Sequence, residues 1–167
     1  SDIAASMQID SGGNSYLIGT FQGTADFDPG AGTTNLTSAG GNDVFIAKYD
    51  STGAMVWAKN VGGTSSDTGS SIAVDSNGNS YVAGTFEGTA DFDPGAGTTN
   101  LTSAGDTDLF IAKYDSTGAL VWAKNAGGTD TDQAASVTVD SSGNSYVTGI
   151  FTGTADFDPG AGTTNLT

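Results

Sequence analysis

The chain has 167 residues and a formal net charge of −15, with 19 acidic residues against four lysines and no Arg, His or Cys. Without His and Cys, the usual zinc sites, histidine-ligated haem and disulfide frameworks are excluded. The missing basic face argues against nucleic-acid binding, and the apolar runs are too short to insert into a membrane.

Sequence elements recur with a fixed period along the whole chain. Asp26-Phe27-Asp28-Pro29-Gly30 returns at 91–95 and at 156–160, in steps of 65 residues. A long fixed period indicates repeat architecture. We therefore divide the chain into unit 1 (1–65), unit 2 (66–130) and a partial unit 3 (131–167). Because the chain starts with Ser and stops within unit 3, we expect a processed product or a window on a longer molecule.

The sequence of each complete unit predicts four short strands and one extra hairpin. In unit 2, strands are expected at 71–75, 80–86, 108–114 and 119–124, and the extra hairpin at 89–102. Asn-Gly and Thr-Gly turns separate alternating apolar runs, and no segment has a helical period. The predicted fold is all-β, with β-propeller-like four-stranded antiparallel blades; an open β-repeat array or solenoid is the alternative.

Three segments of unit 2 resemble a known repeat family. They are Asp-Ser-Asn-Gly-Asn-Ser-Tyr-Val-Ala-Gly-Thr-Phe (75–86), Asp-Phe-Asp-Pro-Gly-Ala-Gly (91–97) and Phe-Ile-Ala-Lys-Tyr-Asp-Ser-Thr-Gly-Ala-Leu-Val-Trp-Ala-Lys (110–124). They look like the bacterial SBBP-type β-propeller repeat. The resemblance implies tandem arrays in large secreted or surface-attached proteins, hence an extracellular or cell-surface location.

The Asp-Phe-Asp-Pro-Gly segment is the strongest candidate for a site. Alternate residues of a strand face one side, so Asp26 and Asp28 are expected to point together and to need compensation of their charge. Calcium prefers such oxygen ligands. The predicted ligands are Asp26, Asp28, Gly30, Asp91, Asp93, Gly95, Asp156, Asp158 and Gly160. An Asp-capped Pro-Gly turn without metal is the alternative.

Other charged residues receive structural interpretations. Asp10, Asp75 and Asp140 begin hairpin turns and are predicted to form Asx turns. Acidic residues near the unit boundaries are expected to be solvated loop charges, with completion of a site from a neighbouring blade as the alternative. They are Asp2, Asp67, Asp106, Asp108, Asp130 and Asp132. The lysines are predicted to protect strand edges; they are Lys48, Lys59, Lys113 and Lys124.

The repetition disfavours catalysis, because a catalytic pair such as Asp91 with Asp93 would then occur three times in identical surroundings. We predict a non-catalytic structural protein: a surface scaffold, adhesin stalk or filament component. A carbohydrate- or protein-binding propeller module is the alternative, and a glycoside-active enzyme is disfavoured. Repeat units with exposed apolar faces tend to associate in water. The expected partners are therefore neighbouring copies of this chain or further repeats of a longer chain.

Overall fold

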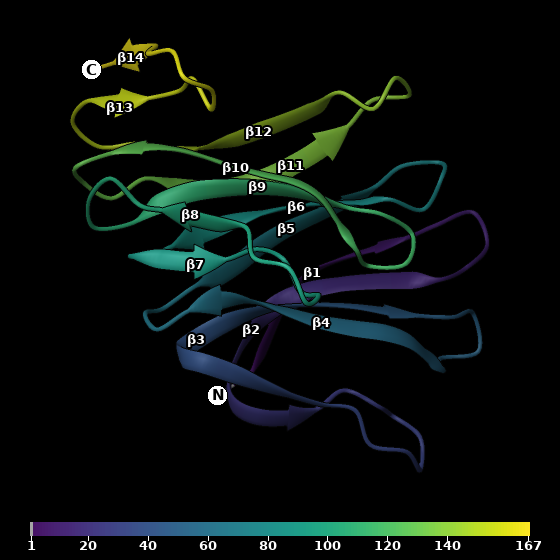
Figure 1. Cartoon of the computed structure of the whole chain (residues 1–167). Helices are drawn as coiled ribbons and strands as arrows, with labels where there is room; N and C mark the ends of the chain where they lie inside the picture. Colours follow the sequence, from purple (N-terminus) through teal and green to yellow (C-terminus); the bar gives the residue numbers. More distant parts are fainter. Residues whose placement is uncertain (1) are drawn as a thin grey trace.

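The computed structural model describes residues 2–167; Ser1, the first residue of the predicted unit 1, lies outside them. β-Branched and aromatic residues alternate between Gly- and Asp-rich turns, which is the pattern of half-buried strands. Fourteen strands and no helix form within the described residues (Figure 1). This result confirms the all-β prediction.

The first sheet contains all four strands of unit 1 and two strands of unit 2. Its spatial order is β1-β2-β3-β4-β7-β8, and the paired strands are antiparallel. The strands are β1 (Ile3–Ile9), β2 (Ser15–Asp26), β3 (Asn35–Tyr49), β4 (Met55–Gly63), β7 (Thr89–Asp91) and β8 (Asn100–Thr102).

The second sheet repeats this order with the strands of units 2 and 3, written β14-β13-β10-β9-β6-β5. Its strands are β5 (Thr68–Val74), β6 (Ser80–Phe86), β9 (Asp108–Tyr114), β10 (Leu120–Gly128), β13 (Ala155–Asp156) and β14 (Asn165–Leu166). A third sheet contains only β11 (Gln133–Val139) and β12 (Ser145–Ile150).

The extra hairpin of a unit is here called the insert hairpin (24–37, 89–102 and 154–167). In units 2 and 3 it joins the sheet of the preceding unit. In unit 2, Asp91 pairs with Gly62 and Ala90 with Gly63 at the end of β4. The same pairing joins β13 to β10. In unit 1 the corresponding segment continues β2 and pairs only with the start of β3 within the described residues. Consecutive units are therefore linked through the backbone as well as through side chains.

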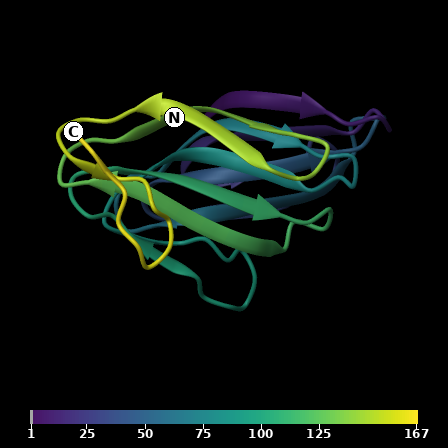
Figure 2. The same ribbon diagram turned by 90° about the horizontal axis from the view of Figure 1, so that it is seen from above.

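The apolar core lies between the sheets. One cluster joins Tyr16 and Ile18 of unit 1 to Ile72 and Val82 of unit 2, and a second joins Tyr81 of unit 2 to unit 3. Seen along the stacking direction, the strands of the three sheets lie over one another (Figure 2). Each unit thus buries its apolar faces against its neighbours, as in other repeat proteins.

The sheets remain open within residues 2–167, and the two termini lie towards opposite ends of the stack (Figure 1). β6 and β9 of unit 2 have the predicted bounds, whereas β10 continues to Gly128, beyond the predicted end at residue 124. The extension exists because the end of β10 pairs with the insert hairpin of the next unit.

Candidate functional sites at the unit junctions

The Asp-Phe-Asp-Pro-Gly segment forms a tight turn held by its own carboxylates. Asp91 Oδ1 accepts hydrogen bonds from the amides of Asp93 at 3.0 Å and Thr99 at 2.8 Å. Asp93 Oδ1 accepts one from the Gly95 amide at 2.8 Å. Its Oδ2 approaches Gly97 so closely that a Cβ atom there would collide with it. Side-chain acceptors of this kind satisfy backbone donors that a turn leaves unpaired.

The phenylalanine between the two aspartates anchors the turn to the core. The Phe92 ring is buried, with its centroid 5.6 Å from that of Phe86 and 4.9 Å from that of Phe110. The Phe92 carbonyl accepts a hydrogen bond of 3.0 Å from the buried Tyr114 hydroxyl. The equivalent Phe27 of unit 1 is only half-buried. The motif thus fixes the insert hairpin in the aromatic core.

The predicted calcium ligands occupy equivalent turns in all three units. Asp26 Oδ1 accepts hydrogen bonds from the backbone amides of Asp28 and Thr34, and these hydrogen bonds lower the pKa of Asp26. Asp28 lies beyond the end of β2, so the alternation of side chains along a strand does not apply to it. Within residues 2–167, no three acidic side chains gather in a way that could hold a metal ion. Calcium at these turns stays a prediction from the sequence.

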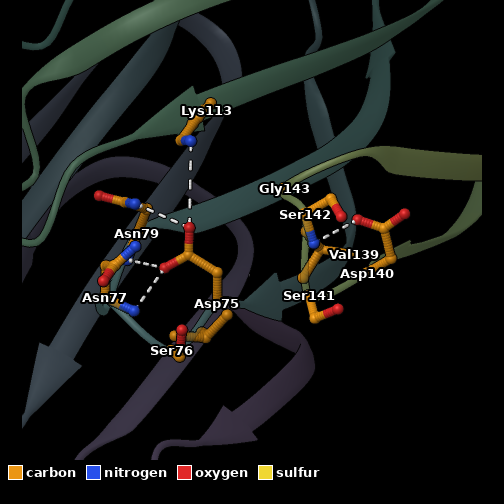
Figure 3. A pocket seen from close by; sticks show the side chains of 11 residues that line it. Asp75, Ser76, Asn77, Asn79, Lys113, Val139, Asp140, Ser141, Ser142 and Gly143 are labelled. Atoms are coloured by element: carbon orange, nitrogen blue, oxygen red, sulfur yellow. Dashed lines mark hydrogen bonds and ion pairs between the residues drawn. The ribbon is translucent and has the colours of Figure 1, made fainter.

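A polar cavity of about 320 Å³ lies between the first hairpin turns of units 2 and 3 (Figure 3). Asp75 Oδ1 accepts hydrogen bonds from the backbone amides of Asn77 and Asn79, and Asp75 Oδ2 accepts one from the side-chain amide of Asn79. Burial opposes the ionisation of Asp75, but these hydrogen bonds and Lys113 outweigh it and leave its pKa below the usual value. The Asx-turn prediction for Asp75 is therefore confirmed.

The same arrangement occurs at the first junction, where a cavity of about 360 Å³ separates the turns of Asp10 and Asp75. Asp10 and Asp140 accept the corresponding amides, so their predicted Asx turns are confirmed as well. A polar recess lined by Asp, Asn, Ser and a lysine thus recurs along one side of the stack.

Two of the four lysines, Lys48 and Lys113, differ from the edge-protection prediction. Lys59 and Lys124 agree with it, because within the described residues the outer sides of β4 and β10 are paired only at their ends. β3 lies between β2 and β4, and β9 lies between β6 and β10, so neither strand is an edge. Lys48 Nζ lies 4.8 Å from the ring centroid of Tyr16, and Lys113 Nζ lies 4.7 Å from that of Tyr81. These contacts are cation–π interactions on tyrosines of the inter-unit core.

Three of the acidic residues near the unit boundaries are buried, which corrects the prediction that they are solvated. They are Asp67, Asp108 and Asp132. Asp43, for which the sequence offers no local pattern, is buried beside Asp67, and Asp108 is buried beside Asp132. The period contained a signal for them, because the spacing from 43 to 67 recurs from 108 to 132. Burial itself follows from sheet stacking, which no local pattern shows.

An all-β chain of stacked antiparallel sheets, repeated with a fixed period and open within residues 2–167, has the architecture expected of β-propeller-type repeat proteins. Comparison with known families agrees with this class. The SBBP family, described as a β-propeller repeat, matches residues 56–85 and 121–149. Two stretches of the chain therefore match the SBBP β-propeller repeat. Each match covers the fourth strand of one unit and the first two strands of the next.

Two curated proteins are similar to parts of the chain. A protein named Regulatory protein FlaEY from Caulobacter vibrioides is 34% identical over 110 residues, covering 66% of this chain and 12% of that protein. An uncharacterized WD repeat-containing protein of Acanthamoeba polyphaga mimivirus is 33% identical over 116 residues, covering 61% of this chain and 8% of that protein. The chain thus spans about a tenth of the length of these relatives.

The part of the chain that the structure describes contains no helix long and apolar enough to cross a membrane.

Proposed function

We propose that the chain is a non-catalytic structural segment whose units stack on further copies of the same unit, within one long chain or between chains. One observation carries the proposal. Met7, Ile72 and Val137 hold the same position in units 1, 2 and 3, and they are 57%, 4% and 5% exposed. The two buried residues face a preceding unit, whereas no unit precedes Met7 within the described residues.

The opposite end of the stack shows the same contrast. Tyr81 is fully buried and donates a hydrogen bond of 3.3 Å to the Gly143 carbonyl of the next unit, whereas the equivalent Tyr146 is 56% exposed. Both outer faces therefore have the shape and polarity of an interface that the middle of the chain already forms. An exposed apolar face of this kind favours association with another unit.

The test places a copy of residues 66–130 directly before Ser1. Stacking would cover Met7, so we expect peroxide to oxidise Met7 more slowly than in the original chain. Met55, the other methionine, provides the internal reference. Peptide mass spectrometry gives both rates in one sample. An unchanged ratio of Met7 to Met55 oxidation would contradict the proposal.

An extracellular or cell-surface scaffold, such as an adhesin stalk or a filament, is the setting that we propose for this stack. The support is the SBBP repeat itself together with the strongly acidic, cysteine-free composition. Fractionation of cells that produce the full-length protein, followed by protease treatment of intact cells, tests the location. Protein that stays inside and protected would contradict it.

Calcium at the Asp-Phe-Asp-Pro-Gly turns is a separable part of the proposal. Its support is chemical: each turn presents two carboxylates and a glycine-rich backbone, and hard cations prefer oxygen ligands. Calorimetry on a chelator-treated sample measures binding, and Asp93→Asn serves as the matched variant. Binding heat and a raised melting temperature, both reduced by Asp93→Asn, are expected. No binding heat and an unchanged melting temperature on adding calcium would contradict calcium binding and leave the stacking proposal intact.

A further inference from the structure

A pair of aspartates is buried at each junction between units. Asp43, near the middle of β3, is 0% exposed, and Asp67, in the turn before β5, is 1% exposed. A Cβ atom added to Gly62 would lie 2.7 Å from Asp43 Cγ and 2.8 Å from Asp67 Oδ2. Both carboxyl groups therefore lie against the same α-carbon, in a space that only glycine leaves open.

The second junction reproduces this geometry. Asp108 and Asp132 are 1% and 0% exposed, and a Cβ atom on Gly127 would lie 2.5 Å from Asp108 Cγ and 2.9 Å from Asp132 Oδ2. The arrangement recurs at both junctions one period apart, as expected for a feature encoded by the repeat.

The hydrogen bonds leave one oxygen of each pair without a partner. Asp67 Oδ2 accepts the Gly63 amide at 2.7 Å, and Asp67 Oδ1 accepts the Glu87 amide at 3.3 Å. Asp43 Oδ2 accepts the Ala39 amide at 2.9 Å. Asp43 Oδ1 is buried and has no partner, and Asp108 Oδ1 is in the same state. An unpaired carboxylate oxygen away from water is costly.

No cationic side chain compensates the pair. The one ion pair within residues 2–167 joins Lys113 to Asp75, at a different site. The groups that face the first pair from the surrounding elements are acidic or neutral: Asn60 on β4, Glu87 after β6, and Asp91 and Asp93 across a cavity of about 230 Å³ that Asp43 also lines. At the second junction, Asn125 faces Asp108. Two adjacent carboxylates without a counter-charge cannot both stay ionised at low cost.

We propose that each junction holds one proton shared by its two buried aspartates, and that loss of this proton weakens the contact between units. Asp43 and Asp108 are the protonated members. Their Oδ1 hydroxyl donates to Oδ2 of Asp67 and Asp132, respectively, which gives the unpaired oxygen a partner and removes one buried charge. Two carboxyl groups that share a site titrate as a pair.

The electrostatics support the proposal. Burial raises the pKa of Asp67 to about 6, and the carboxylates of Asp43 and Glu87 add to this shift when they are ionised, although amide hydrogen bonds oppose it. Because the two aspartates titrate as a pair, the raised value belongs to the pair, and the unpaired Oδ1 assigns the proton to Asp43. Burial likewise raises the pKa of Asp43. Burial and the charge of Asp132 raise the pKa of Asp108. A carboxyl group with a higher pKa in the folded than in the unfolded protein makes stability fall as pH rises between the two values. The first junction should therefore weaken as the pH rises from about 4 to about 6, and the second junction should change in the same direction.

The test compares melting temperatures between about pH 4.5 and pH 8 for the original chain and for Asp43→Asn with Asp108→Asn. Asn keeps the shape, carries no charge and donates a hydrogen bond where the proposed acid does. We expect the melting temperature of the original chain to fall across this range and that of the double variant to stay level and exceed it at pH 8. Asp106→Asn, an exposed neighbour, is the control and should keep the original slope.

Carboxyl carbon NMR gives a readout that does not depend on the variants. In the original chain, one carboxyl group of each pair should titrate above the ordinary range of aspartate. Two outcomes would overturn the proposal. One is that all four carboxyl groups titrate in the ordinary range of aspartate. The other is a flat melting profile together with stabilisation by calcium at pH 8 that Asp43→Asn abolishes, because the pair would then bind a cation.

Discussion

The middle and the ends of the stack contain nearly the same sequence in different surroundings. β5 and β6 of unit 2 are covered on both sides, and Ile72 and Tyr81 are buried there. β1 at one end and β12 at the other expose the equivalent Met7 and Tyr146. Burial in this molecule therefore depends on the neighbouring unit more than on the local sequence. Substitutions at equivalent positions of different units test that difference.

The largest effect is expected from Phe92→Ala. Phe92 fills the core next to Phe86 and Phe110, so its removal should cost about 3–5 kcal/mol of unfolding free energy. Phe27→Ala in unit 1 should cost clearly less, because Phe27 is half-buried. Denaturant unfolding followed by tryptophan fluorescence measures both. Equal losses would show that unit 1 is packed as tightly as unit 2.

A slightly smaller difference is expected from Ile72→Ala, which should cost about 2–5 kcal/mol, while Met7→Ala should stay within about 0.5 kcal/mol. The side chains occupy the same position of the unit, so the comparison isolates the contribution of the preceding unit. Thermal unfolding of both variants is the measurement. A comparable loss for Met7→Ala would mean that β1 is already covered in solution, for example by a second chain.

The smallest effect concerns one hydrogen bond between units. The Val137 amide donates to the buried Ser71 Oγ at 3.1 Å, so Ser71→Ala leaves a buried donor unpaired and should cost about 1–3 kcal/mol. Ser136→Ala, at the equivalent but exposed position of unit 3, should be nearly neutral. Hydrogen exchange of the Val137 amide gives the local readout. Unchanged protection in Ser71→Ala would indicate that another acceptor replaces the hydroxyl.

Much of the fold was predictable because the period and the turn residues are local signals. The all-β class, the bounds of β6 and β9, and the Asx turns of Asp10, Asp75 and Asp140 follow from such patterns. The pairing of β7 with β4 was not predictable, since a hairpin carries no mark of the sheet that it joins.

The junctions were harder to predict than the strands. Asp67 and Asp132 lie in polar turn sequences and look solvated, but the stacking of whole sheets buries them. Lys48 and Lys113 lie on inner strands, where their ammonium groups contact the rings of Tyr16 and Tyr81. Both results depend on contacts between distant segments, which single-sequence patterns do not encode.

The pairing of each insert hairpin with the preceding sheet has a consequence for synthesis. A ribosome makes β1 to β4 first, and the open side of β4 gains its partner only after residues 89–91 have emerged. The sheet of one unit is therefore completed by the next unit as the chain grows. In a longer array of such units, only the newest sheet would lack its outer strands at any moment. The next unit covers the end of the β4 edge at Gly62 and Gly63, and Lys59 lies on the part of that edge that stays unpaired.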